Sequence, residues 1–377
     1  MGDKILYISL ANFSERISRD WFIDDLINDK YNVEFYDITN IFYKNEINKD
    51  LSNKIKIIQI NTYKELEDAL SITNNETLKI VLLVSLNIKT LKIYRILKKL
   101  NTKIIFFEQG SLPKYKSNKF FKLYRILINP YKYFKILFNS LTIKILTQIN
   151  YIKKYNIVFG VGEKFNVQNN KLDCLYFNIN LSDYDQFKLA QNKSNLLNYK
   201  YALFLDINAI ENPDYYILNM PLLDKESYFN SINNFFSSLE QKFKIKIIIA
   251  AHPSTNIENC NYQNRAVIKL NTAVLTKYSE FVITHHSTSI SYAILEKKPI
   301  ISIYTQEMKK IYKNSIIKSI ISQTQYLGTK PYNINNFEAN NIQLKVNYVL
   351  YDKYKYEFIT SCSSENKFSK DIFSKNI

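Results

Sequence analysis

Glycine is scarce in this chain, at only 5 of 377 residues, where an average composition would give about 7%. Phosphate-binding loops of the P-loop and dinucleotide-binding types need closely spaced glycines, because the backbone must approach the phosphates. The one Gly-x-Gly, formed by Gly160 and Gly162, is followed by Phe165 where a third glycine would be required. Both types of loop are therefore excluded.

Cysteine is also rare, and Cys174, Cys260 and Cys362 lie far apart in the sequence. An odd number without a Cys-x-x-Cys pair indicates neither a disulfide framework nor a zinc knuckle, and it fits a reducing cytoplasm. No apolar run approaches the ~18 residues of a membrane-spanning helix. The short apolar run at residues 5–10 predicts a first strand and not a signal peptide. We therefore expect a cytoplasmic protein whose membrane contact is peripheral.

Acidic residues are missing from one long stretch, because positions 109–162 contain no Asp or Glu and ten Lys or Arg. The whole chain has 51 Lys+Arg against 34 Asp+Glu, a net charge of +17, so this stretch holds more than half of the excess. Aromatic and aliphatic residues alternate with these bases at helical intervals, as in basic amphipathic helices. A packed helix pair with a solvated lysine face and a segment that docks on an anionic membrane both fit. Nucleic-acid binding fits least, because no helix-turn-helix, zinc-finger or RNP-like motif is present.

Short apolar runs alternate with helical patterns along both halves of the chain, which predicts parallel sheets covered by helices. A polar stretch at 181–200 interrupts this alternation and predicts a connection between two domains. The sequence thus predicts an α/β protein with two Rossmann-like domains at 1–185 and 196–360, whose parallel sheets face a central cleft. The basic amphipathic segment is placed at 114–155, and residues 361–377 are expected to form a frayed polar tail.

The histidines all follow apolar strands, at the carboxyl ends where parallel sheets bind ligands. His252 follows the apolar run 247–251, and Pro253 restrains the turn after it. His285 and His286 follow a second run and open a hydroxyl-rich helix start. Their adjacent spacing is not that of metal ligands, so we expect no metal site. The hydroxyls of this helix start are Ser287, Thr288 and Ser289.

Those three hydroxyls have two possible roles, either to cap the helix or, with its free N–H groups, to hold a phosphate. Two carboxylates are also expected at strand ends. Glu108 closes the run 104–107 and is a candidate general base, with a solvated or capping carboxylate as the alternative. Asp206 ends the run 203–205 and is a second candidate.

Three short motifs together resemble bacterial sialyltransferases and polysialyltransferases. They occur in the order of that family and span residues 108–289, and Gln109 departs from the pattern where the family has a second acid. The same arrangement resembles capsule-synthesis Kdo transferases and, more distantly, teichoic acid polymerases that use CDP-glycerol. The motifs are Glu108, Gln109 and Gly110 for the acid-acid-Gly motif, His252 and Pro253 for the His-Pro motif, and Ser287 and Thr288 with Ser289 for the paired Ser/Thr motif.

The resemblance implies a GT-B glycosyltransferase that takes a CMP-activated sugar and needs no metal or other cofactor. Glu108 would then deprotonate the acceptor hydroxyl, and His252 would contact the donor phosphate and stabilise the leaving group. The resemblance also implies a donor site with further members. These are Gly110, Pro253, His286, Ser287, Thr288 and Ser289, with Asp206 and His285 as additional candidates.

We therefore expect an enzyme of bacterial capsule or lipopolysaccharide assembly that moves sialic acid or a related keto-sugar acid. Its acceptor would be a glycan or lipid-linked oligosaccharide, and the basic segment would dock on the anionic inner-membrane surface. Two alternatives remain. One is a GT-B enzyme with a UDP-sugar or CDP-glycerol donor, acting as a transferase or a 2-epimerase. The other is a non-enzymatic basic protein that binds a polyanion.

Overall fold

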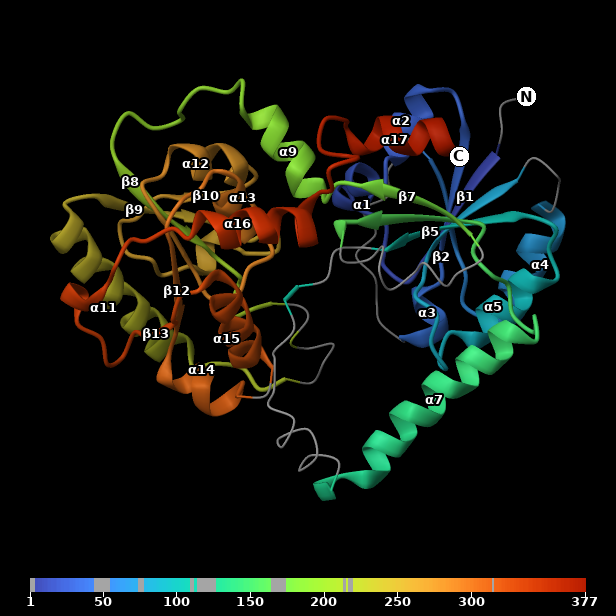
Figure 1. Ribbon diagram of the computed structural model, residues 1–377, viewed down its shortest axis with the longest axis horizontal. Coiled ribbons are helices and arrows are strands. Elements are labelled where there is room, and N and C mark those ends of the chain that lie inside the picture. The colour runs from blue at the N-terminus through green and yellow to red at the C-terminus, as the bar shows by residue number, and fades with distance from the viewer. Residues whose placement is uncertain are drawn as a thin grey trace.

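The protein is described from a computed structural model, in which two sheet-based units lie side by side along the longest axis (Figure 1). Both chain ends lie on the first unit. The structure describes residues 4–43, 55–73, 78–108, 112–113, 127–163, 174–212, 215, 220–313 and 315–377.

The first unit is built on a parallel sheet of order β3-β2-β1-β4-β5-β6-β7. The apolar runs of this half predict six strands, at 4–10, 32–38, 54–60, 79–86, 103–107 and 157–160, and the structure confirms all six. The sequence-based prediction ended the sheet at β6, however, and the structure adds β7 at its edge. The strands are β1 (Lys4–Ser9), β2 (Asn32–Asp37), β3 (Lys56–Gln59), β4 (Lys79–Leu83), β5 (Lys103–Glu108), β6 (Ile157–Val161) and β7 (Leu175–Ile179). The helices are α1 (Glu15–Asp20), α2 (Ile23–Asn28), α3 (Thr39–Phe42), α4 (Tyr63–Thr73), α5 (Leu91–Lys98) and α7 (Pro130–Gln148).

The second unit has a parallel sheet of order β10-β9-β8-β11-β12-β13. In both sheets the first strand lies between the second and the fourth, the doubly wound order whose ligand crevice opens where the winding reverses. Here that point lies between β8 and β11. The strands are β8 (Tyr201–Leu205), β9 (Lys246–Ala250), β10 (Val267–Ile268), β11 (Val282–Thr284), β12 (Ile300–Tyr304) and β13 (Tyr332–Asn333). The helices are α9 (Ser182–Ala190), α11 (Lys225–Phe243), α12 (Thr272–Tyr278), α13 (Ile290–Leu295), α14 (Gln306–Ile311), α15 (Ile316–Leu327) and α16 (Tyr348–Tyr354), with short η1 (Ile257–Asn259), η2 (Ala339–Asn341) and η3 (Lys355–Ile359).

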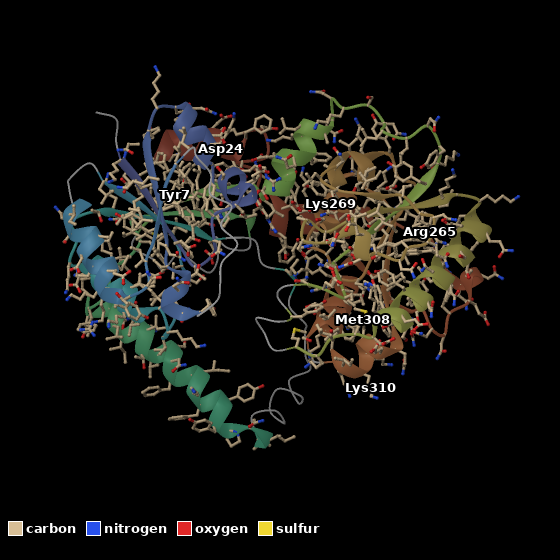
Figure 2. The ribbon with its side chains drawn as sticks, turned by 180° about the vertical axis from the view of Figure 1, so that it is seen from behind. Tyr7, Asp24, Arg265, Lys269, Met308 and Lys310 are labelled. Carbon is tan, nitrogen blue, oxygen red and sulfur yellow. The ribbon has the colours of Figure 1, made fainter. Side chains whose placement is uncertain are left out.

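The central strands are apolar on both faces because helices cover both sides of each sheet. Every residue of β8 is buried, and its side chains alternate between two cores. Phe204 packs in the core that contains Phe236 of α11, with ring centroids 5.1 Å apart. Leu203 and Leu205 belong to the opposite core with α12 and α13. In the first unit Tyr7 is similarly buried within the sheet (Figure 2).

The pattern of residues 14–28 predicts one helix, but the structure breaks it into α1 and α2. Phe22 lies between them in the left-handed region, with φ 61°. A buried hydroxyl accounts for the break, because Tyr7 Oη donates to the carbonyl oxygen of Trp21 at 2.7 Å. The break also directs Phe22 into the core beside Phe107.

Within the described residues the chain crosses between the two units near 181 and near 360, and these two crossings run together. The Leu181 N–H donates to the Ile359 carbonyl oxygen at 2.8 Å, and Thr360 Oγ1 donates to Asn180 Oδ1 at 2.6 Å. The end of β6 also approaches the second crossing. Gly162 has φ 74°, and a Cβ there would lie 2.4 Å from the Glu357 carbonyl oxygen. The stretch predicted as a linker at 181–200 thus includes α9, which packs on α12 and α13.

The predicted frayed tail is wrong. After the second crossing the chain forms α17 (Ser369–Asn376), which packs on β7 of the first unit. Phe373 is fully buried, with its ring centroid 5.1 Å from those of Phe107 and Phe159 and 5.4 Å from that of Phe22. This mostly polar segment forms a packed helix because its few apolar residues complete a core whose other residues are far away in the sequence.

Helix α7 extends away from the body of the first unit, and its side chains project into open space (Figures 1 and 2). Among the described residues, the contacts that anchor this part of the chain lie at and just after the C-terminal end of the helix. Leu146 packs on the core, Lys153 N–H donates to the Tyr94 carbonyl oxygen at 3.1 Å, and the Arg95 guanidinium lies 4.7 Å from the ring centroid of Tyr151. No helix in the described part of the chain is both long enough and apolar enough to span a membrane.

Candidate functional site

The residues predicted at strand ends of the second unit gather at one edge of its sheet. His252 follows β9, Asp206 follows β8, and His285 and His286 follow β11. These strands are neighbours in the order β9-β8-β11. The group therefore lies at and beside the point where the winding reverses.

His252 is half-buried and is held through one ring nitrogen. Its Nδ1 accepts from the Ser254 backbone N–H at 3.2 Å and lies 2.8 Å from Ser254 Oγ, which in turn accepts from Asn208 Nδ2 at 3.1 Å. A neutral imidazole that accepts at Nδ1 carries its proton on Nε2. That nitrogen can then donate to an anionic oxygen. Sequence reasoning missed Ser254, although its position two residues after the histidine was a usable signal.

Asp206 organises the loops around His252. It is 5% exposed and accepts from the Asn208 backbone N–H at 3.0 Å, Thr255 Oγ1 at 3.0 Å and Tyr262 Oη at 3.1 Å. Burial raises the pKa of this carboxyl, and the three hydrogen bonds oppose the shift. The side chain joins the loop after β8 to the loop after β9. Its oxygens thus join the two loops, and a role for Asp206 in the reaction stays a prediction.

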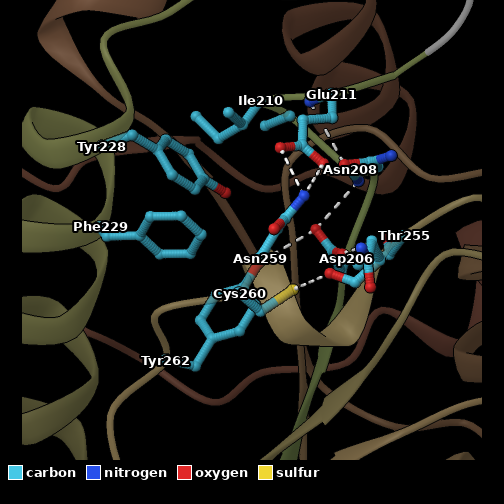
Figure 3. A pocket seen from close by; sticks show the side chains of 12 residues that line it. Asp206, Asn208, Ile210, Glu211, Tyr228, Phe229, Thr255, Asn259, Cys260 and Tyr262 are labelled. Atoms are coloured by element: carbon cyan, nitrogen blue, oxygen red, sulfur yellow. Dashed lines mark hydrogen bonds between the residues drawn. The ribbon is translucent and has the colours of Figure 1, made fainter.

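A small hollow, partly open to solvent, lies beside Asp206 (Figure 3). The Glu211 carboxylate accepts from Asn259 Nδ2 at 3.1 and 3.2 Å across its rim. Cys260 also lines it, and burial raises the pKa of that thiol to about 11, so the sulfur stays protonated near neutral pH. Polar groups in its walls hydrogen-bond to one another, and the residues that line it include no activated nucleophile.

His285 belongs to the core and not to the site, which corrects the sequence-based expectation. It is fully buried, with Nδ1 2.9 Å from the Ile303 carbonyl oxygen and Nε2 3.0 Å from Tyr228 Oη. Nδ1 must donate to the carbonyl, so Nε2 accepts the tyrosine proton. Burial lowers the pKa of this imidazole to about 4. A neutral ring whose two nitrogens both have hydrogen-bond partners can neither donate a hydrogen bond to a ligand nor accept one from it.

His286 points to a different environment from its neighbour. Its Nδ1 is buried and has no hydrogen-bond partner among the described residues, and burial lowers the pKa of the ring. Ser287 Oγ accepts from the Ser289 N–H at 3.2 Å, whereas Ser289 makes no side-chain cap to α13 and Thr288 is exposed. Capping thus employs one hydroxyl of the three, which keeps a ligand role open for the others.

Glu108 closes β5 in the other sheet, where it is half-buried. Its charge acts on two tyrosines. It contributes to raising the pKa of Tyr155 to about 12 and of Tyr176 well above the usual range, in each case after burial as the larger cause. Its partners in the predicted motif, Gln109 and Gly110, lie outside the described residues, as do residues 114–126 of the basic segment. Pro253 is exposed beside His252.

No cluster of three or more His, Cys, Asp or Glu able to hold a metal occurs within the part of the chain that the structure describes. The expectation that no metal is needed stays a prediction.

The sequence matches no family model and no curated protein. Solved structures do match. The calicheamicin glycosyltransferase CalG4 aligns with a TM-score of 0.52 at 8% sequence identity, over 93% of this chain and 92% of that chain. The chain has the GT-B fold.

Other GT-B-like matches are more distant. Spinosyn forosaminyltransferase SpnP aligns with a TM-score of 0.46 at 8% identity, over 94% of this chain and 91% of that chain. The UDP-GlcNAc 2-epimerase from Methanocaldococcus jannaschii aligns with a TM-score of 0.45 at 13% identity, over 100% and 99%. At these identities the similarity concerns the fold. The chemistry of the site has to be argued from its residues.

Proposed function

We propose that this GT-B protein is a glycosyltransferase that moves a sugar from a nucleotide-activated donor to an acceptor hydroxyl. One observation carries the proposal: His252 and the loop 287–289 lie at the ends of β9 and β11, which flank β8 in the sheet. A nucleotide phosphate between them would meet the Nε2–H of His252 on one side and hydroxyls of Ser287 and Thr288 on the other.

The reaction needs a base for the acceptor and stabilisation of the departing phosphate. Glu108, at a strand end of the other sheet, is the proposed base. It takes the proton from the acceptor hydroxyl as the new C–O bond forms. The bond between the sugar and the phosphate breaks, and its electron pair leaves on the phosphate oxygen. His252 and the hydroxyls of Ser287 and Thr288 stabilise that oxygen. We propose that no metal takes part.

The donor nucleotide has two candidates. The motifs around Glu108, His252 and Ser287 resemble those of enzymes that use CMP-linked keto-sugar acids. The GT-B fold accommodates a UDP-sugar at least as well, and Gln109 weakens the resemblance where the family has an acid. We therefore propose that the donor is a nucleotide sugar, and the experiment below identifies its nucleobase.

The proposed location of the protein rests on the surface of α7. Its apolar residues are largely exposed, including Phe134, Leu137 and Phe138 at 66%, 68% and 57%. Lys135 and Lys144 are exposed on the same helix, and 109–162 contain no acid to repel anionic lipid. Exposed apolar side chains argue against the helix pair with a packed apolar face. We propose that α7 docks on the anionic inner-membrane surface, where a lipid-linked acceptor for capsule or lipopolysaccharide would lie.

The decisive experiment incubates the protein with CMP-, UDP- and CDP-linked donors, each with and without EDTA, and identifies the released nucleotide. We expect release from one nucleotide class, unaffected by EDTA. Glu108→Gln should abolish transfer and His252→Ala should reduce it by about 100-fold or more, with unchanged circular dichroism.

Other outcomes contradict the proposal in different ways. An interconverted UDP-sugar without release indicates an epimerase. No turnover of any donor, together with tight salt-sensitive binding to DNA or another polyanion, indicates a binding protein. Full activity in the Glu108→Gln variant would remove that residue from the mechanism.

A further inference from the structure

Three residues lie level with one another where β5, β6 and β7 end. Glu108 pairs with Gly160, and Gly160 pairs with Asn178. Tyr176 precedes Asn178 by two positions on the same strand. Because side chains of a strand alternate between faces, Tyr176 leaves the sheet on the same face as Asn178.

Gly160 makes room for the Tyr176 side chain. A Cβ at position 160 would lie 1.8 Å from Tyr176 Oη and 2.6 Å from its Cζ. The backbone of Gly160 does not have the positive φ that requires glycine, unlike that of Gly162. Space, and not backbone conformation, is therefore what the missing side chain provides. The phenol of Tyr176 therefore lies over Gly160 of β6, the strand next to the one that carries Glu108.

The Tyr176 hydroxyl is buried and has no hydrogen-bond partner among the described residues. A buried unpaired hydroxyl costs stability, so its presence calls for an explanation. Burial and the charge of Glu108 both raise the pKa of this phenol. It therefore keeps its proton at neutral pH and can donate it in a hydrogen bond.

Tyr155, the other phenol near Glu108, cannot donate a hydrogen bond to the carboxylate. Its Oη lies 2.6 Å from Tyr94 Oη, and Tyr94 donates to the Val84 carbonyl oxygen at 2.5 Å. The proton between the two phenols therefore comes from Tyr155. Its ring is also fixed by stacking on Phe106, with centroids 4.4 Å apart.

We propose that Tyr176 is a positioning residue for Glu108. Its O–H, held over Gly160 and unpaired among the described residues, donates to one oxygen of the carboxylate once the acceptor is bound. The other carboxylate oxygen then faces the acceptor hydroxyl and takes its proton, while the proton of Tyr176 stays on the phenol. This inference rests on the proposed role of Glu108 as the base, and it adds a residue that no motif contains.

The first test compares Tyr176→Phe with Tyr94→Phe. Tyr176→Phe should lower kcat by about 10-fold to 100-fold, the worth of a hydrogen bond to a charged group, with the donor KM unchanged. The acid limb of its pH profile should shift to higher pH, because the carboxylate loses a donor. Its melting temperature should equal or exceed that of the wild type. Tyr94→Phe, which removes a paired hydroxyl, should melt earlier and keep the wild-type pH profile.

The second test does not depend on activity. With ¹³Cζ-labelled tyrosine, the NMR signal that Tyr176→Phe removes should shift in a step as Glu108 titrates, and Glu108→Gln should abolish the step. Gly160→Ala should also abolish it, because the new Cβ displaces the ring.

These two tests separate failure of the inference from failure of the proposed function. An active enzyme whose kcat and pH profile survive Tyr176→Phe overturns the inference, and so does the absence of the NMR step. A present step in a protein that turns over no donor leaves the coupling between Tyr176 and Glu108 in place and overturns the function.

Discussion

Tyr228 Oη lies 3.0 Å from Nε2 of His285, and it supplies the only proton that this nitrogen, deep in the core of the second unit, accepts among the described contacts. The opposite nitrogen donates to the Ile303 carbonyl oxygen on β12. The pair thus joins α11, β11 and β12 through one ring.

Removing the tyrosine hydroxyl should destabilise the second unit. Tyr228→Phe leaves Nε2 of His285 buried without a donor, which costs about 1–3 kcal/mol. We expect that loss in the free energy of unfolding by urea, with transfer activity per folded molecule unchanged. A stability equal to that of the wild type would show that the ring has another partner.

The same histidine should make stability depend on pH. Its pKa lies at about 4 in the folded protein and at 6.5 as the ordinary value. Above pH 6.5 the ring is neutral in both states. As the pH falls from 6.5 towards 4, the unfolded chain binds a proton that the folded chain excludes, so folding weakens.

The full loss is roughly 3 kcal/mol from two and a half pKa units. It is measured as the pH dependence of urea unfolding in the wild type minus that in His285→Gln. His286 shifts in the same direction and stays in both proteins, so the difference isolates His285. No difference between the two proteins between pH 7 and pH 4.5 would contradict the burial of this ring.

The two nitrogens of His252 should be separable by substitution. Nδ1 accepts from the Ser254 N–H, and Nε2 is the proposed donor to phosphate. The amide nitrogen of glutamine reaches about as far as Nε2, and that of asparagine about as far as Nδ1. His252→Gln should therefore keep more donor affinity than His252→Asn, by about 10-fold, in nucleotide binding by calorimetry. The reverse order would place Nδ1 at the ligand.

The last helix should matter for the first unit. Phe373→Ala opens a cavity beside Phe107 and Phe159 and should cost about 3–5 kcal/mol. Thermal unfolding followed by the fluorescence of Trp21, near Phe107, reports on this core. An unchanged transition would show that α17 is dispensable.

Docking through α7 should depend on its own charges. Lys135→Glu with Lys144→Glu should weaken sedimentation with vesicles that contain phosphatidylglycerol, by at least about 10-fold at roughly 1 kcal/mol per lysine plus the added repulsion. The control is Lys309→Glu with Lys310→Glu, which makes the same charge change at exposed positions of α14. Equal binding by both variants would count against docking through this helix.

The strands were predictable where they are buried on both faces. Runs such as 201–205 and 246–250 are continuously apolar, which marks central parallel strands. β7 was missed because it lies at the edge of the sheet, where Leu175 is exposed and the apolar signal is weaker. α17 was missed because its packing partners, Phe22, Phe107 and Phe159, are far away in the sequence.

The sequence predicted where the site lies, at the ends of the strands, but not the role of each residue in it. The sequence placed His252, Asp206, His285 and His286 at one edge, but adjacent histidines look alike in a sequence. Only packing shows that His285 faces Tyr228 inside the core. Gly160 was visible too, and its meaning depends on Tyr176, a residue of the next strand whose path over it no local pattern encodes.

The buried Phe373 sets an order of assembly on the ribosome. The second unit, with all its strands between positions 201 and 333, can close its cores before α17 emerges. The first unit is made earlier, yet it lacks one wall until residues 369–376 return to it. During synthesis the first unit therefore exposes an apolar face until α17 is made. A ribosome that stalls within the second unit leaves a nascent chain that is prone to aggregation.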